Sequence, residues 1–246
     1  MNKNLWLLAL CQGLFLTNNV VFIAINGLVG LQLAPFGWMA TLPVMGYVVG
    51  GALSTPLVAK TQMRWGRKVS FQIGLAVAMA SAALCAWAAF SANFWLLCTA
   101  TVVAGYYSAN GQLYRFAAAE LAKESYREKA VSLVLAGGLL GAVAGPNLAS
   151  ATRTLFPVPF AGAYLALIGV ALLAMVCMAA IHFEAQPVAR DATGQPKQGR
   201  PLRELMRQPA FVVAILGAAL GYGVMNLLMA ATPLAMQVCG FDFDSA

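Results

Sequence analysis

Seven long apolar runs constrain what this chain can fold into. Each run exceeds 20 residues; short connections separate the first six runs, and a longer hydrophilic segment separates the sixth from the seventh. The runs are Leu5–Leu33, Trp38–Ala59, Val69–Phe90, Phe94–Phe116, Ala130–Ala151, Phe160–His182 and Ala210–Val238. A bilayer core needs roughly 20 apolar residues per helix, and backbone groups in lipid must pair within their own segment. The runs therefore predict an all-α, polytopic membrane protein with seven spans.

The composition argues against a water-soluble helical bundle, which is the simplest alternative. The mean hydropathy is +0.77, and only 9% of the residues are charged, too few to cover a soluble surface. The first run is too long for a signal peptide and lacks a cleavage site before a hydrophilic region, so we interpret it as a retained span. Four of the five cysteines lie inside apolar runs without metal-ligand spacing. We expect them to be ordinary core residues, and we expect neither a metal site nor a cofactor.

The basic residues predict the orientation of the spans. All but two of the 15 Lys and Arg lie before the first run or in the connections after the second, fourth and sixth runs. The exceptions are Arg115 and Arg153. The positive-inside rule then places the amino terminus and these connections in the cytoplasm, with the chain as a multi-pass protein of the inner (plasma) membrane. Because the cations lie between membrane spans, nucleic-acid binding is not expected.

The spacing of the runs predicts three parts. Residues 1–183 form a six-span domain, in which spans 1–3 and 4–6 can be two inverted three-helix repeats. Residues 184–209 form a hydrophilic, basic cytoplasmic linker, whose second half is expected to include a short surface helix. Residues 210–246 hold the seventh span, which we interpret as the start of an incomplete second half.

Glycines recur at intervals of four in two of the spans. Gly137, Gly141 and Gly145 precede Pro146 in the fifth span, and Gly46 and Gly50 occur in the second. This spacing places small residues on one helix face, where another helix can approach closely. We expect these stripes to pack against a partner half of the protein.

Several polar residues fall inside the predicted spans. Gln12, Asn19 and Asn26 recur at intervals of seven, so they share one face of a helix. For Asn19, Asn26 and Tyr107, a water-filled cavity and an interhelical hydrogen bond are equally open explanations.

Arg115 is the one charged residue inside a predicted span. Its side chain either extends to the nearby membrane surface or faces a cavity, where it would bind an anion or pair with an acid. No Asp or Glu lies well inside a span, so proton coupling lacks support. The sequence also has no motif of a soluble enzyme, and we expect the protein not to be an enzyme.

Two motifs resemble those of the major facilitator superfamily, in particular its drug-efflux-like branch. The first is "RWGRK", which supplies Arg64, Gly66, Arg67 and Lys68 between spans 2 and 3. It resembles the end of the family's loop motif G-x-x-x-D-R-x-G-R-K. The second, "GAVAGP" at 141–146, resembles the family's span 5 motif G-x-x-x-G-P. The resemblance covers essentially the whole chain.

The loop motif departs from the family pattern in its acidic half. Its glycine falls at Ala59 and its aspartate at Met63. In the family that aspartate is thought to pair with positive charge across the domain interface, so the resemblance does not predict this contact here. The family's span 4 arginine, expected near Ala100 or Thr101, is also absent.

The resemblance implies a secondary transporter that works by alternating access. Spans 1, 4 and 7 would line a central site for a small amphipathic organic solute, with export as the expected direction. The candidate substrate contacts are Asn19, Asn26, Tyr107, Asn110, Arg115 and Asn226. The alternatives are a half-size transporter that works as a homodimer and a truncated, inactive product. A seven-helix photoreceptor is disfavoured, because the seventh run lacks the lysine that retinal requires.

Overall fold

A computed structural model describes residues 3–183 and 202–239, which form helices joined by short turns and contain no strand. The helices are α1 (Lys3–Leu33), α2 (Leu42–Phe90), α3 (Phe94–Gly111), α4 (Tyr114–Leu121), α5 (Arg127–Thr152), α6 (Ala161–Ala179), α7 (Leu202–Leu205) and α8 (Pro209–Val238). Short 3-10 turns occupy Gly37–Met39 and Glu124–Tyr126. In the described residues, five helical segments are long and apolar enough to cross a membrane. The predicted all-α, polytopic class is confirmed.

α2 contains two of the predicted spans and the basic connection between them. Gly66 interrupts it with a φ of 81° and a ψ of 169°, a backbone conformation that residues with a Cβ atom rarely adopt. The chain reverses there, and two antiparallel helices follow one another with a single non-helical residue between them. The glycine of the loop motif is therefore required by the turn itself.

The predicted fourth span is divided between α3 and α4 by a turn at Gln112 and Leu113. The Phe15 ring of α1 packs directly on Gly111, the last residue of α3, and leaves no room there for a side chain. The bounds of the other predicted spans agree with the structure to within a few residues.

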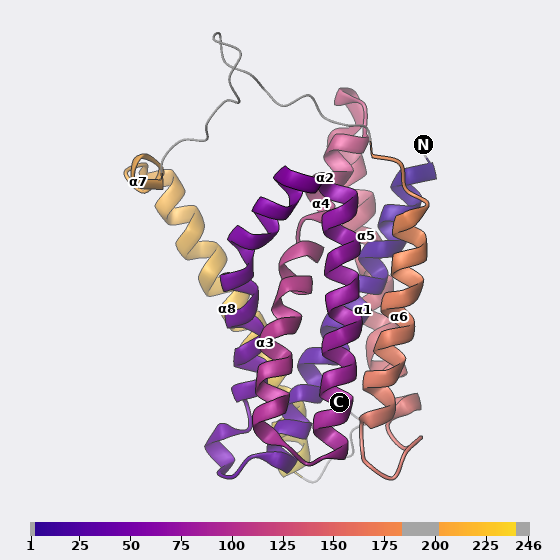
Figure 1. Cartoon of the computed structure of the whole chain (residues 1–246). Coiled ribbons are helices and arrows are strands. Elements are labelled where there is room, and N and C mark those ends of the chain that lie inside the picture. The colour runs from indigo at the N-terminus through magenta and orange to yellow at the C-terminus, as the bar shows by residue number, and fades with distance from the viewer. Residues whose placement is uncertain (1–2, 184–201, 240–246) are drawn as a thin grey trace.

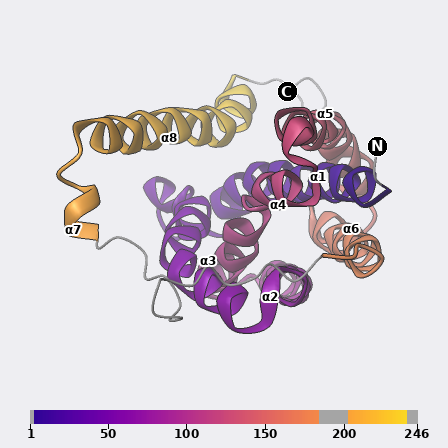
Figure 2. The same ribbon diagram turned by 90° about the horizontal axis from the view of Figure 1, so that it is seen from above.

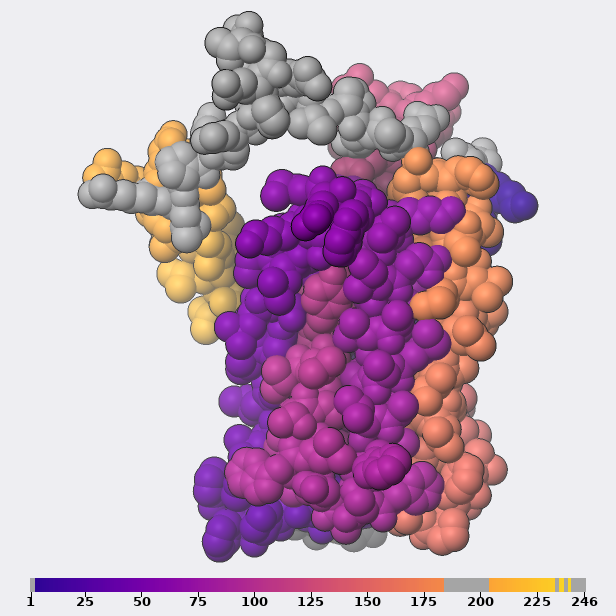
Figure 3. All heavy atoms as spheres, in the orientation of Figure 1, coloured from indigo at the N-terminus to yellow at the C-terminus, as the bar shows by residue number. Residues whose placement is uncertain are grey.

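α1 lies at the centre of the bundle (Figure 2). It packs most extensively on α5 and also contacts α6 and α8, while α2 packs mainly on α3 and α6. α8 lies at the edge and leans away from the bundle at its α7 end (Figures 1 and 3). The predicted linker lies largely outside the described residues, as does the end of the chain from residue 240.

Glycines bring two helix pairs into backbone contact. A Cβ atom added at Gly141 would collide with the Gly13 carbonyl oxygen of α1, and one at Gly137 with the Ala9 carbonyl oxygen. In the second pair, a Cβ at Gly50 of α2 would collide with the Val102 carbonyl oxygen of α3. The prediction that these stripes face a partner half is wrong: both face helices of the same bundle. The spacing of the glycines indicates a close approach but contains no information about which helix approaches.

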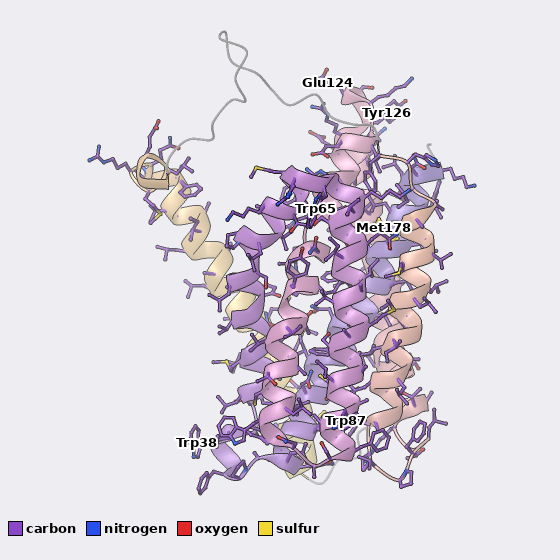
Figure 4. All side chains as sticks on the ribbon, viewed as in Figure 1. Trp38, Trp65, Trp87, Glu124, Tyr126 and Met178 are labelled. Atoms are coloured by element: carbon purple, nitrogen blue, oxygen red, sulfur yellow. The ribbon has the colours of Figure 1, made fainter. Side chains whose placement is uncertain are left out.

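Exposed aromatic side chains lie at the two ends of the bundle. Trp65 and Tyr126 lie at the end that holds Lys3 and the basic turns, here called the basic end, and Trp38 and Trp87 lie at the opposite end (Figure 4). The helix that follows the turn beside Trp65 runs 20 residues from Arg67 to Trp87, which corresponds to about 30 Å. This separation matches a bilayer core of about 30 Å with aromatic residues at both interfaces.

Candidate functional site

A pair of polar side chains joins α1 to α2 in the interior of the bundle. The Asn19 Nδ2 atom donates a hydrogen bond to the Tyr47 hydroxyl oxygen over 2.8 Å, and both side chains are buried. The Phe22 ring packs on the Tyr47 ring with a centroid separation of 5.0 Å. The tyrosine therefore presents its hydroxyl group from an otherwise apolar helix face.

Two more helices bring hydroxyl groups to the same place. Ser108 of α3 and Tyr222 of α8 lie near the Tyr47 side chain, close enough to interact with it. We call Asn19, Tyr47, Ser108 and Tyr222 the midplane cluster.

The position of the cluster along the helices gives it this name. Asn19 lies about 24 Å along α1 from the basic end, and Ser108 about 21 Å along α3 from the other end. Both distances place the cluster near the middle of a membrane-spanning bundle.

The cluster contains no charged side chain. The acidic residues that the structure describes, Glu120, Glu124, Glu128 and Glu204, lie in α4, in the turn before α5, in the first turn of α5 and in α7, respectively. Hydroxyl and amide groups donate and accept hydrogen bonds without a net charge. The arrangement therefore suits a neutral molecule with polar edges and an aromatic or apolar body.

Asn226 is the α8 side chain that is buried beside this region. It is 7% exposed, and its Nδ2 atom donates to the Tyr222 carbonyl oxygen over 2.8 Å. Its Oδ1 atom is buried and has no hydrogen-bond partner among the described residues. The structure thus brings two of the predicted contacts, Asn19 and Asn226, to the region of the cluster.

Two of the other predicted residues form hydrogen bonds between helices away from the cluster. Asn26 accepts a hydrogen bond from the Tyr164 hydroxyl of α6 over 2.8 Å. Asn110 accepts one from the Ser70 hydroxyl of α2 over 2.9 Å. Both asparagines are fully buried. Gln12, Asn19 and Asn26 share a helix face in the sequence, yet Asn19 and Asn26 bind different neighbouring helices because α1 is surrounded on several sides.

Tyr107 lies near Tyr47 of the cluster but shares none of its hydrogen bonds in the part of the chain that the structure describes, whereas Arg115 lies on α4. The Tyr107 ring packs edge-on against Phe15 with a centroid separation of 5.4 Å, and its buried hydroxyl has no partner among the described residues. Arg115 is exposed on α4, where its guanidinium group lies over the Phe116 ring, 5.1 Å from the centroid.

The loop motif uses its second half to hold the basic end together. Arg67 forms an ion pair with Glu120 of α4. The Lys68 Nζ atom donates to the Ala179 carbonyl oxygen at the end of α6 over 2.6 Å, where a cation is favoured by the helix dipole. Met63, at the position of the family aspartate, is 82% exposed. Arg67 and Lys68 therefore act between helices of this bundle.

Tyr47 was missed by reasoning from the sequence. A tyrosine inside the second span is a detectable signal, because its hydroxyl group needs a partner when it is buried. It was overlooked because only spans 1, 4 and 7 were expected to line the central site.

The family model described as "Major Facilitator Superfamily" matches residues 5–246. Among curated proteins, "Riboflavin transporter RfnT" of Brucella anthropi is 33% identical over 245 residues, which are 99% of this chain and 61% of the relative. "Uncharacterized MFS-type transporter YdeG" of Bacillus subtilis is 28% identical over 51% of this chain and 29% of its own length. The chain thus spans less than two thirds of the length of either relative.

Proposed function

The chain belongs to the major facilitator superfamily, and from this membership we propose that it is part of a secondary active transporter that works by alternating access. The proposed substrate is a small amphipathic organic solute with a flavin-like aromatic ring system. The similarity to a protein named as a riboflavin transporter, over 99% of this chain, supports this class of substrate.

The observation that carries the proposal is the neutral midplane cluster. Transporters commonly bind their substrates near the middle of the bilayer, between helices of different repeats. Asn19, Tyr47, Ser108 and Tyr222 come from four helices and offer hydroxyl and amide groups beside aromatic rings. Such a site favours a neutral heterocycle, because an organic ion would need a charged partner in this setting.

The basic end is proposed to face the cytoplasm. Most of the lysines and arginines lie at that end, and the positive-inside rule assigns it to the cytoplasmic side of the inner membrane. Asn110 and Arg115, between the cluster and the basic end, then remain candidates for contacts along the cytoplasmic half of the substrate path.

We propose that a second helical bundle completes the transporter. α8 is exposed along most of its length, and so are Leu139, Leu140 and Val143 of α5. The second bundle is either a further segment or a second copy of this chain. Cross-linking of the purified chain distinguishes the two, since only a second copy gives a discrete covalent dimer.

The drug-efflux-like motifs favour export as the direction of transport.

Riboflavin flux across proteoliposomes that contain the purified chain tests the proposal. We expect saturable flux, measured separately in each direction, if a second copy supplies the second bundle, and saturable binding of riboflavin without flux if a further segment supplies it. Tyr47→Phe should reduce the flux or the affinity roughly tenfold, because one hydrogen-bonding group at a buried site is lost. Tyr126→Phe makes the same chemical change on an exposed side chain and should leave the flux unchanged.

Two other outcomes are informative. If riboflavin binds to the chain without crossing the membrane, the second bundle is required for transport. If the wild-type chain neither binds nor moves riboflavin, the proposed substrate class is wrong.

A further inference from the structure

Asn226 is one of two buried side chains among the described residues of α8, a helix that is mostly exposed. The neighbouring side chains Val224, Met225, Leu227 and Leu228 are all exposed, whereas Asn226 and Ala230, one turn apart, are each 7% exposed. Ala230 belongs to the apolar core cluster that includes Val21 and Phe22 of α1. α8 therefore turns its Asn226 face toward the bundle.

The orientation of the Asn226 amide is determined by its own helix. Its Nδ2 atom donates to the Tyr222 carbonyl oxygen over 2.8 Å. Exchanging the amide nitrogen and oxygen would place two acceptors against each other, so this hydrogen bond settles the assignment. The Oδ1 atom is consequently the free end of the amide, and it is buried without a partner among the described residues.

An unpaired acceptor is rare in a protein interior, because the group has lost its water without gaining another donor. Here it lies one helical turn from Tyr222, which is near Tyr47 of the midplane cluster. It also lies about 25 Å along α8, at the depth of the cluster. An acceptor is therefore held in place beside a group of hydroxyls.

We propose that the Asn226 Oδ1 atom is a specificity-determining acceptor for a ring N–H group of the substrate. This inference rests on the proposed function and narrows the substrate class to aromatic heterocycles that carry an imide. An imide presents one N–H donor between two carbonyl acceptors. Asn226 would bind the donor, and the hydroxyl groups of Tyr47, Ser108 or Tyr222 would bind the carbonyl groups.

Binding of riboflavin and of riboflavin methylated on its imide nitrogen tests this role. Quenching of flavin fluorescence gives the dissociation constant of each probe for the purified chain. Wild type should bind riboflavin roughly tenfold more tightly than the methylated probe, since methylation leaves the buried acceptor unpaired. Asn226→Leu should bring the ratio of the two constants close to one.

Two further variants separate a loss of imide recognition from a loss of correct folding. Burial in the span favours the neutral form of the carboxyl introduced by Asn226→Asp, so at pH 5 its protonated form donates to the Tyr222 carbonyl through its hydroxyl and keeps an acceptor oxygen, and this variant should retain the preference. Thr232→Val changes an exposed polar residue on the same helix and should also retain it. If Asn226→Leu is not monodisperse, the ratio of the two dissociation constants is measured with Asn226→Ala instead, and that ratio tests the role of Asn226.

The outcomes distinguish this inference from the proposed function. If wild type binds both probes equally, or if Asn226→Leu keeps the wild-type ratio, Asn226 does not determine specificity while riboflavin binding stands. If wild type binds neither probe, the proposed function fails and the inference fails with it.

Discussion

α5 and α8 contain the same kind of sequence but are packed differently. Both are apolar, and both have glycines four residues apart, at 137, 141 and 145 in α5 and at 217 and 221 in α8. In α5 these glycines lie against the backbone of α1, whereas no atom lies within 4 Å of a Cβ position at Gly217 or Gly221. The pattern gives a helix the capacity for close approach, and the neighbouring helix decides whether that capacity is used.

This difference divides the molecule into a closely packed body, α1 to α6, and a lightly attached helix, α8. The midplane cluster lies where the two meet, with Asn19, Tyr47 and Ser108 in the body and Tyr222 on α8. A helix with few buried contacts can change its position at low cost. Contacts within the body should therefore determine the free energy of unfolding of the chain, and contacts to α8 should determine the affinity for the substrate.

The largest expected effect is that of Gly141→Ala. The added methyl group would collide with the Gly13 carbonyl oxygen, so α1 and α5 must separate, at a cost of about 1–3 kcal/mol. Thermal unfolding of the detergent-solubilised chain measures the loss. Gly169→Ala in α6 and Gly221→Ala in α8 have open space around them and should be neutral or slightly stabilising. Equal losses in all three variants would contradict the division into body and attached helix.

A smaller effect is expected from removing one hydroxyl group from the body. Tyr164→Phe leaves the buried Asn26 Oδ1 atom without the donor that it has at 2.8 Å, at a cost of about 1 kcal/mol. Tyr222→Phe removes a hydroxyl from α8, where the side chain is 37% exposed, and should change the unfolding temperature little. A larger loss for Tyr222→Phe than for Tyr164→Phe would show that α8 contributes to the stability of the body.

The sequence predicted the helices well and their contacts poorly, for a physical reason. Run length follows directly from the thickness of the bilayer, so the predicted bounds of α1, α5, α6 and α8 agree with the structure. Helix partners depend on tertiary geometry, which the sequence pattern does not contain. The glycine stripe of α5 was therefore assigned to the wrong neighbour, and Asn19 and Asn26 bind different helices despite their common face.

The candidate site was predicted only in part for the same reason. Asn19 and Asn226 were predicted as substrate contacts because amides are unusual inside a membrane span, and this role stays a prediction. Tyr47 lies between apolar residues of α2 and is recognisable only when its hydroxyl is seen to bind Asn19. Likewise, the ion pair between Arg67 and Glu120 joins residues 53 positions apart, which the spacing of the loop motif does not reveal.

The smallest expected effect concerns that ion pair, which belongs to the body and lies at its basic end. The Arg67 and Glu120 side chains are 26% and 27% exposed, whereas Arg127 and Glu124 are 57% and 91% exposed with 3.8 Å between Nη1 and Oε1. Partial burial reduces screening by water, so a double-mutant cycle with Arg67→Gln and Glu120→Gln should give a coupling energy of up to about 1 kcal/mol. The same cycle on Arg127 and Glu124 should give a coupling near zero, because both groups are solvated. If the two cycles give the same coupling energy, the loop motif does not stabilise the body through the pair of Arg67 and Glu120. The contribution of the motif must then come from the turn at Gly66 and the contact of Lys68 with α6.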